Sequence, residues 1–218
     1  MADHILDTFT GGAHTLAASG GGSDSDFTGP TNSTVPNDWG MRETVLRTFA
    51  SAGPSSATMS LGGGQLNMAW EMSNLTGGGV HASLQLGYFF TSPGAPLGAM
   101  PILSIPGSGS IAGDYASVEF SVGLTDVNGL TALWLLPTST GAFNGGQFDL
   151  STVPDDMSPG FDFNSVSRIV VWFAAYLEPI PGATGTGSIT LTQIDIVPTP
   201  GAAALLGLGG LMAARRRR

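Results

Sequence analysis

The fold is decided by residues 65–90, QLNMAWEMSNLTGGGVHASLQLGYFF. In Gln65–Met72 large apolar residues alternate with polar or small ones, and the alternation returns in Val80–Phe90. A period of two is typical of β-strands with one buried face. The glycine-rich segment between the two runs predicts a hairpin. We expect six side chains to lie in one core between two antiparallel sheets: Leu66, Met68, Trp70, Leu84, Leu86 and Tyr88.

Other short runs on both sides of this region also predict strands, with turn residues between them. Asn128-Gly129 is a favoured hairpin turn. No sustained helical stripe is present, so we expect an all-β protein, an antiparallel β-sandwich of the jelly-roll type. The additional strands are expected at Asp3–Phe9, Arg42–Phe49, Ser56–Leu61, Ala116–Val122, Leu130–Leu136 and Val166–Ala174.

Four segments carry more specific expectations. Val166–Ala174 contains five contiguous apolar residues, which predicts a strand buried on both faces. The phase of the apolar residues changes near Gln193, which predicts a β-bulge in the last strand. Ala17–Asn37 is expected to be a long loop, and Leu135–Phe163 has little pattern.

The charge balance excludes some classes of function. The chain has no lysine, and four of its seven arginines are the last four residues. Residues 1–214 carry three arginines against sixteen carboxylates, a formal charge of −13. Because such a surface repels phosphate backbones, we expect no nucleic-acid partner. Cysteine is absent, which excludes disulfides, thiolate zinc sites and thiol nucleophiles.

The composition changes abruptly at the C-terminus. Gly201–Ala214 is a run of fourteen residues without a polar side chain, followed by four arginines. Counted from Val197, a helix would span roughly 27 Å, a marginal membrane crossing. The arginines would act as a membrane stop on the cytoplasmic side: Arg215, Arg216, Arg217 and Arg218. We therefore predict a β-sandwich body at 1–196 and a tail at 197–218, whose hydrophobic helix lies outside the sandwich.

This tail resembles the PEP-CTERM sorting signal, also named the ice-binding protein C-terminal domain. The resemblance rests on Pro198-Thr199-Pro200-Gly201, the Ala/Leu/Gly run and the terminal arginines. Thr199 stands where the family's commonest form has glutamate. The resemblance implies an exported bacterial protein, held transiently in the membrane by its C-terminal helix. An exosortase would process it at Val197, Pro198, Thr199, Pro200 and Gly201, leaving the body at the cell surface, in the cell envelope or in the extracellular matrix.

Export also requires an N-terminal leader. Met1-Ala2-Asp3-His4 has neither a basic start nor an apolar stretch. We therefore expect a leader upstream of this sequence, and the alternative is a cytoplasmic protein with this tail.

The sequence contains few residues arranged as a catalytic or metal-binding motif. His4, His14 and His81 lack zinc-binding spacing, and neither a nucleophile elbow nor a phosphate loop is present. We predict no catalytic, cofactor-binding or metal-ligating residue. Asp24 and Asp26 are spaced as in calcium loops, and Asp155-Asp156 lie in a second acidic segment. We interpret these carboxylates as solvated loop acids, and the alternative is a structural calcium ion.

The tryptophans bear on sugar binding. Trp39 is the one expected to be exposed, whereas Trp70 and Trp172 fall in buried patterns, and Trp134 is the fourth. An aromatic platform would favour sugar binding. A cleft with two carboxylates about 5–10 Å apart would instead favour a glycoside hydrolase.

The end of the body resembles the closing part of galactose-binding-like jelly rolls, including many carbohydrate-binding modules. The resemblance rests on Phe161–Val166 and Ile189–Val197, and implies that Asp195 lies towards Asp3–Phe9, where calcium could bind. We predict an exported, non-catalytic structural or binding module with an exosortase and extracellular polysaccharide as partners. The alternatives are a secreted polysaccharide-active enzyme and a carbohydrate-binding module proper.

Overall fold

The computed structural model describes residues 4–28, 31–35, 38–91 and 102–197. These residues form strands and one short 3-10 helix, η1 (Phe163–Ser165). The strands are β1 (His4–Asp7), β2 (His14–Ser19), β3 (Ser23–Thr28), β4 (Asp38–Ala50), β5 (Ser55–Gly62), β6 (Gln65–Ser73), β7 (Val80–Phe90), β8 (Ile102–Ile105), β9 (Gly107–Gly113), β10 (Tyr115–Asp126), β11 (Thr131–Thr138), β12 (Gly141–Phe143), β13 (Gly146–Asp149), β14 (Asp156–Met157), β15 (Val166–Leu177), β16 (Thr184–Leu191) and β17 (Ile194–Val197).

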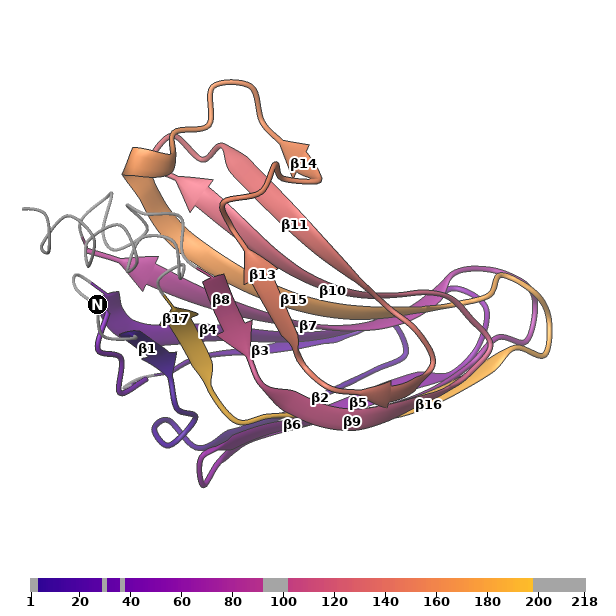
Figure 1. The fold of residues 1–218 in the computed structure, drawn as a ribbon. Helices are drawn as coiled ribbons and strands as arrows, with labels where there is room; N and C mark the ends of the chain where they lie inside the picture. The colour runs from indigo at the N-terminus through magenta and orange to yellow at the C-terminus, as the bar shows by residue number, and fades with distance from the viewer. Residues whose placement is uncertain (1–3, 29–30, 36–37, 92–101, 198–218) are drawn as a thin grey trace, which may run out of the picture.

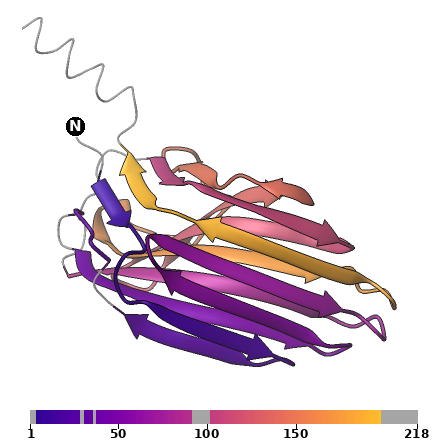
Figure 2. The same cartoon turned by 90° about the horizontal axis from the view of Figure 1, so that it is seen from below.

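The strands form an antiparallel β-sandwich, as the alternation predicted (Figure 1). One layer is a seven-stranded sheet, with the order β14-β11-β10-β15-β7-β4-β3. The other layer is a six-stranded sheet, with the order β12-β9-β16-β6-β5-β2. A four-stranded sheet, β1-β17-β8-β13, lies at the end where the chain begins. Figure 2 shows β1 beside β17 at this end, and Ile5 is paired with Asp195 there.

The core lies between the two large sheets. All six core side chains predicted from residues 65–90 are buried, with Trp70 the most accessible at 4%. The predicted hairpin is wrong, however, because β6 pairs with β5 and β16, whereas β7 pairs with β4 and β15. The two strands face each other from opposite sheets, so their apolar rows bury one another directly.

The loop between β6 and β7 is an arch from one sheet to the other. Asn74 is fully buried and fixes this arch. Its amide donates to the carbonyl oxygens of Gly78 and Glu178, at 2.8 and 2.9 Å, and its side-chain oxygen accepts from the Gly77 N–H at 2.8 Å. The glycines allow the turn, and Gly77 adopts a φ of 86°.

Two further expectations about strands are corrected. Ala17–Asn37 is not one loop, because β2 ends at Ser19 and all of β3 lies within this range. They are short edge strands, and the inward positions of β3 are Asp24, Asp26 and Thr28, so no apolar period marks it. The change of phase near Gln193 is not a bulge within one strand. The chain leaves the six-stranded sheet after β16 and joins the four-stranded sheet as β17.

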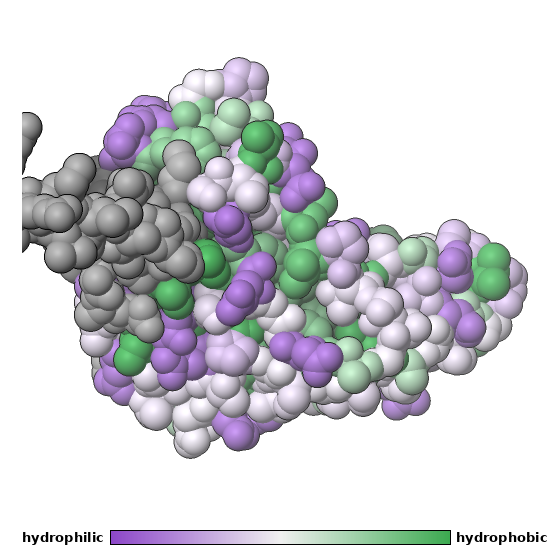
Figure 3. All heavy atoms as spheres, in the orientation of Figure 1, coloured by the Kyte–Doolittle hydropathy of each residue, from purple (hydrophilic) through white to green (hydrophobic). Residues whose placement is uncertain are grey.

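A mixed surface covers the side of the molecule turned to the viewer in Figure 3, where hydrophobic residues are interspersed with polar ones. The expected sorting residues after Val197, the apolar helix and the arginine stop lie outside the described residues. Val197 itself is the last residue of β17. Within the described residues, we find no helix with the length and apolarity needed to span a membrane.

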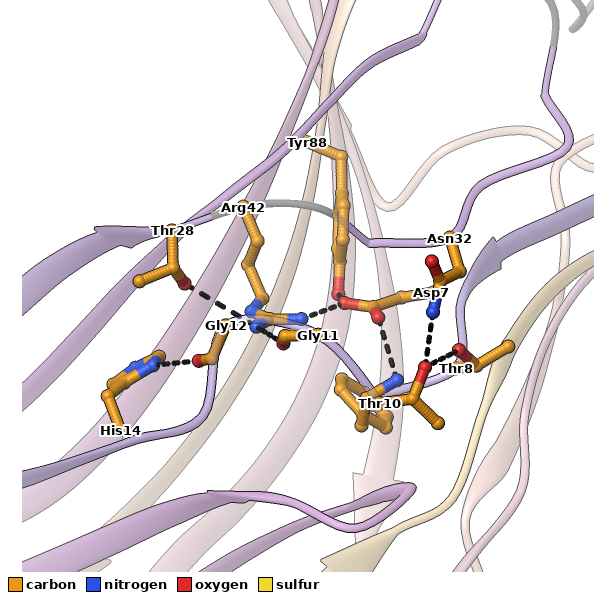
Figure 4. A network of polar contacts seen from close by, with 11 residues as sticks. Asp7, Thr8, Thr10, Gly11, Gly12, His14, Thr28, Asn32, Arg42 and Tyr88 are labelled. Carbon is orange, nitrogen blue, oxygen red and sulfur yellow. Dashed lines mark hydrogen bonds and ion pairs between the residues drawn. The ribbon is translucent and has the colours of Figure 1, made fainter.

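A buried ion pair joins the first strand to the seven-stranded sheet (Figure 4). Arg42 of β4, Tyr88 of β7 and Asp7 of β1 all have an exposure of 0%. The Arg42 guanidinium donates to Asp7 Oδ2, and the Tyr88 hydroxyl donates to the same oxygen at 3.0 Å. The other carboxylate oxygen accepts from the Phe9 N–H at 2.8 Å. The carboxylate is therefore satisfied entirely by protein donors.

Burial and charge oppose each other at this site. Burial raises the pKa of the Asp7 carboxyl, and the Arg42 guanidinium and the hydrogen bond from Phe9 partly offset that rise. Burial also raises the pKa of Tyr88 well above its ordinary value, so its hydroxyl stays protonated and remains a donor. Phe9, two residues after this carboxylate, adopts a φ of 54°, which is uncommon for a residue with a side chain.

We predict that removing one charge destabilises the fold more than removing both. Asp7→Asn leaves Arg42 as an uncompensated buried cation, and it should lower the free energy of unfolding by about 3–5 kcal/mol. The double variant Asp7→Leu/Arg42→Met should recover most of that loss, because no buried charge remains. Urea denaturation of the single and double variants measures both values. A cost below about 1 kcal/mol for Asp7→Asn would contradict the proposed role of the pair.

Candidate functional site

The side of the seven-stranded sheet turned away from the core carries most of the exposed rings of the protein. We call it the aromatic face. Strand register places the members of β4, β7, β10, β11 and β15 on this one side. Its large apolar and aromatic members are Phe27, Trp39, Phe49, His81, Phe89, Leu135, Trp172 and Tyr176, and its charged and amide members are Glu43, Arg47, Gln85, Glu119 and Arg168.

Trp172 stands near the middle of the aromatic face. It pairs with Gln85 of β7 on one side and with Ser121 of β10 on the other. Its exposure is 38%, so the expectation that β15 is buried on both faces is wrong. The core side of β15 is buried as expected, but Arg168, Val170 and Trp172 lie on the open side. A tryptophan held partly exposed on a rigid strand is an unusual surface residue.

Ring clusters lie at both ends of the aromatic face. At one end His81 lies between Phe49 and Tyr176, with ring centroids 5.3 and 5.1 Å apart. Burial lowers the pKa of His81, which favours the neutral ring at pH 7.

At the other end Phe27, Trp39 and Phe89 touch one another, with centroid distances from 5.6 to 6.1 Å. Phe49, Phe27 and Trp39 are 47%, 43% and 53% exposed. The exposure that the sequence predicted for Trp39 is confirmed.

An ion pair crosses the face between Trp172 and the second ring cluster. Arg168 of β15 donates to Glu43 of β4, and its guanidinium carbon lies 4.8 Å from the centroid of the Phe89 ring. The pair passes over Gly87 of β7. A Cβ atom at Gly87 would lie 2.7 Å from an Arg168 nitrogen and 3.1 Å from a Glu43 oxygen. The glycine therefore provides the space that the pair occupies.

The face carries equal numbers of charges of each sign. Arg47 and Arg168 are its arginines, and Glu43 and Glu119 are its carboxylates. Arg42 is buried, so these are the two arginines exposed to solvent among the described residues. The two glutamates are three strand spacings and four residues apart, about 20 Å between backbones. Paired glycosidase acids lie roughly 5–9.5 Å apart.

The outer side of the six-stranded sheet is different in character. It holds a shallow depression of about 560 Å³ across β2, β5, β6 and β16. No aromatic side chain lines it. Its outward-facing residues are small or hydroxyl-bearing, with one amide: Thr15, Ala17, Thr58, Ser60, Asn67, Ala69, Ser188 and Thr190. Asp24 of β3, at the edge of the seven-stranded sheet, also lines the depression.

The carboxylates with calcium-like spacing lie at the sheet edges. Asp24 accepts from the Ala17 N–H of β2 at 3.0 Å and from the Ser25 N–H of β3 at 2.9 Å. Asp26 accepts from the Phe27 N–H at 2.8 Å. Both strands are open edges, so these carboxylates occupy backbone donors that another strand could use.

The other acidic candidates are also separate from one another. Asp155 accepts from the Leu135 N–H at the edge of β11, at 2.7 Å, and Asp156 lies in β14. Asp195 accepts a hydrogen bond from Gln193. Its strand, β17, pairs with β1, as the resemblance to galactose-binding-like jelly rolls implied. Across the described part of the chain, no three His, Asp or Glu side chains gather closely enough to hold a metal ion.

Sequence reasoning missed most of the aromatic face. It found no site at His81, and it treated Trp172 as buried, because an apolar run has the same appearance whether its second face meets a core or solvent. One signal was available. Arg168 interrupts the pattern of β15, and the sequence places Glu43 and Gln85 at outward positions of the neighbouring strands.

Comparison with known proteins gives similarity at the level of the fold. No family model matches the chain, and no curated protein matches it. The family 11 carbohydrate-binding module of the cellulosomal cellulase Lic26A-Cel5E of Clostridium thermocellum is similar over 91% of this chain and 95% of its own, at 12% identity and a TM-score of 0.35.

Two enzymes show similarity of the same kind. A loop-swap mutant of Xyn11A from Necallimastix patriciarum aligns over 85% of this chain and 100% of its own, with 10% identity and a TM-score of 0.44. An exo-β-agarase aligns over 71% of this chain but only 24% of its own, with 10% identity and a TM-score of 0.35.

We predict that Gly87→Ala disrupts the Arg168–Glu43 pair. The matched control is Gly123→Ala on β10, where the nearest atoms lie 3.8–4.0 Å from the added Cβ. The control should be neutral or gain up to about 1 kcal/mol, because alanine restricts the unfolded chain. Gly87→Ala should be less stable than Gly123→Ala by about 1 kcal/mol or more, measured by urea denaturation. Equal stabilities would contradict the close approach at Gly87.

Proposed function

We propose that the protein is an exported, non-catalytic carbohydrate-binding module that uses its aromatic face to bind extracellular polysaccharide. The observation that carries the proposal is Trp172, partly exposed at the centre of a rigid sheet and flanked by Gln85 and Ser121. Several exposed rings gathered on one side of a sheet favour an interaction site there, because each ring supplies apolar contact area on a fixed backbone.

The chemistry of the face matches that of a sugar ring. A pyranose presents C–H groups on its faces and hydroxyl groups around its rim, so it needs a flat apolar support with polar groups beside it. The Trp172 ring supplies the support. The amide of Gln85 and the charged groups of Arg168 and Glu43 lie on neighbouring positions and can exchange hydrogen bonds with hydroxyls.

The proposal is for binding rather than hydrolysis. Glu43 and Glu119 lie too far apart on this face to work as an acid pair, and Glu43 is engaged by Arg168.

The tail supplies the proposed location. Residues 198–218 resemble an exosortase sorting signal, so we propose transient insertion in the membrane, processing near Val197–Gly201, and retention of the body at the cell surface or in the matrix. A surface module that binds polysaccharide would then connect the cell to that matrix.

Trp172→Ala tests the proposal directly. Affinity electrophoresis would use four neutral polymers (hydroxyethylcellulose, xylan, galactomannan and agarose) and two acidic ones (alginate and polygalacturonate). Wild-type protein should be retarded by at least one of them. Trp172→Ala should weaken that binding at least about tenfold, as expected for a central aromatic contact.

The controls separate binding from folding. Val153→Ala removes an apolar side chain that is 89% exposed in a loop, and it should leave binding unchanged. Trp172→Phe should retain part of the affinity, because a ring remains. Unfolding curves establish that each variant is folded. Full binding by a folded Trp172→Ala protein, or no binding to any of the six polymers by the wild type, would refute the proposal.

Processing of the tail has its own test. In the native host, with the leader restored, mature protein at the surface or in the medium should lack Arg215–Arg218, because the tail is removed. Intact-mass measurement of that fraction gives the result. Mature protein that keeps all four arginines would refute sorting and favour a plain C-terminal membrane anchor.

A further inference from the structure

We infer that the aromatic face binds an extended, uncharged glycan chain that lies along β7 and β15, over three ring positions. This inference rests on the proposed function and specifies its ligand. The three ring positions are the Phe49/His81/Tyr176 cluster, Trp172, and the Phe27/Trp39/Phe89 cluster.

The three positions are evenly spaced along the strands. On β7, His81 belongs to the first cluster, Gln85 is paired with Trp172, and Phe89 belongs to the last cluster. Each step is four residues, or about 13 Å, and the whole row spans roughly 27 Å. A single sugar or a disaccharide cannot reach from one cluster to the other. A chain of several sugar residues can.

The two intervals between the ring positions differ: small side chains form the first, and an ion pair crosses the second. Ser83 and Ala174 lie between the first cluster and Trp172, and both are small and buried. Gly87 and Val170 lie between Trp172 and the last cluster. The Arg168–Glu43 pair crosses this second interval. A chain lying along the row would therefore alternate between ring contacts and polar contacts, as its own faces and hydroxyls require.

The path across the strands offers fewer aromatic rings to a bound chain than the path along them. From Trp172 the path leads in one direction to Ser121 and then to Leu135 of β11, which is 42% exposed. In the other direction it leads to Gln85 and then to the buried Val45. This row holds one aromatic ring, whereas the row along the strands holds three ring positions. The lengthwise path has the greater apolar support for a chain.

The charges of the face favour an uncharged ligand. Glu43 already pairs with Arg168, which leaves Arg47 as the cation of this face without an ion-pair partner among the described residues. Glu119 offsets it. The neutral form of His81 adds no charge at pH 7. The remaining carboxylates give the body a strong negative field, which repels a polyanion during approach.

A length series tests the inference. Oligosaccharides of two, four, six and eight residues, prepared from each of the four neutral polymers, would be titrated by calorimetry. Affinity should rise at each step up to six residues and change little beyond. Phe49→Ala and Trp39→Ala should each weaken binding of the longest oligosaccharide about tenfold and leave disaccharide binding unchanged. Leu135→Ala is the matched control on the crosswise path, and it should have no effect.

The outcomes distinguish this inference from the proposed function. Affinity independent of length, or loss of affinity in Leu135→Ala but not in Phe49→Ala and Trp39→Ala, would overturn the lengthwise chain while binding through Trp172 stands. Preference for alginate or polygalacturonate would overturn the uncharged ligand. Full binding by Trp172→Ala would overturn both the inference and the proposed function.

Discussion

The buried pair of Asp7 and Arg42 is the contact on which the end of the sandwich depends. The first strand lies in the small sheet, and Arg42 belongs to the seven-stranded sheet, so the pair links two sheets that share no backbone ladder. The guanidinium also donates to Gly11 O at 3.2 Å, which fixes the loop that leads from β1 to β2. A pair of this kind contributes less to net stability than an apolar contact of equal size, but it accepts only one arrangement of its partners. It therefore fixes how the end sheet sits on the sandwich.

The aromatic face is built on the strands next to this pair. Arg42 and Glu43 are consecutive on β4, as Tyr88 and Phe89 are on β7, so inward and outward groups alternate along the same backbone. The inward members hold the network of Asp7, whereas the outward members hold the ion pair of Arg168 and one ring cluster. Rigid backbone beneath a binding surface limits the entropy lost on binding. The positions of Trp39, Phe49, His81 and Phe89 are thus fixed by the same two strands that fix the end of the fold.

Sequence reasoning predicted the class of fold and its main core, because alternation in β6 and β7 reports burial of one face directly. It could not predict the partners of these two strands, since the period is the same for a hairpin and for an arch between sheets, and here the arch is correct. It missed β3 because the inward residues there are aspartates, and it missed Trp172 because burial on the second face depends on the neighbouring layer. Asp24 and Asp26 were interpreted as solvated loop acids, with a calcium ion as the alternative, but both lie in β3 and accept hydrogen bonds from backbone N–H groups.

The pairing of β17 with β1 on one side and β8 on the other has a mechanical consequence. Hydrogen bonds between antiparallel strands run perpendicular to the strand axis. A pull applied to the chain beyond Val197 acts along that axis, so it loads the bonds on both sides of β17 in shear and must break several together. Peeling a strand from an edge breaks them one at a time. A body that is attached through its last strand and binds a polymer through its other strands would therefore resist unfolding under tension.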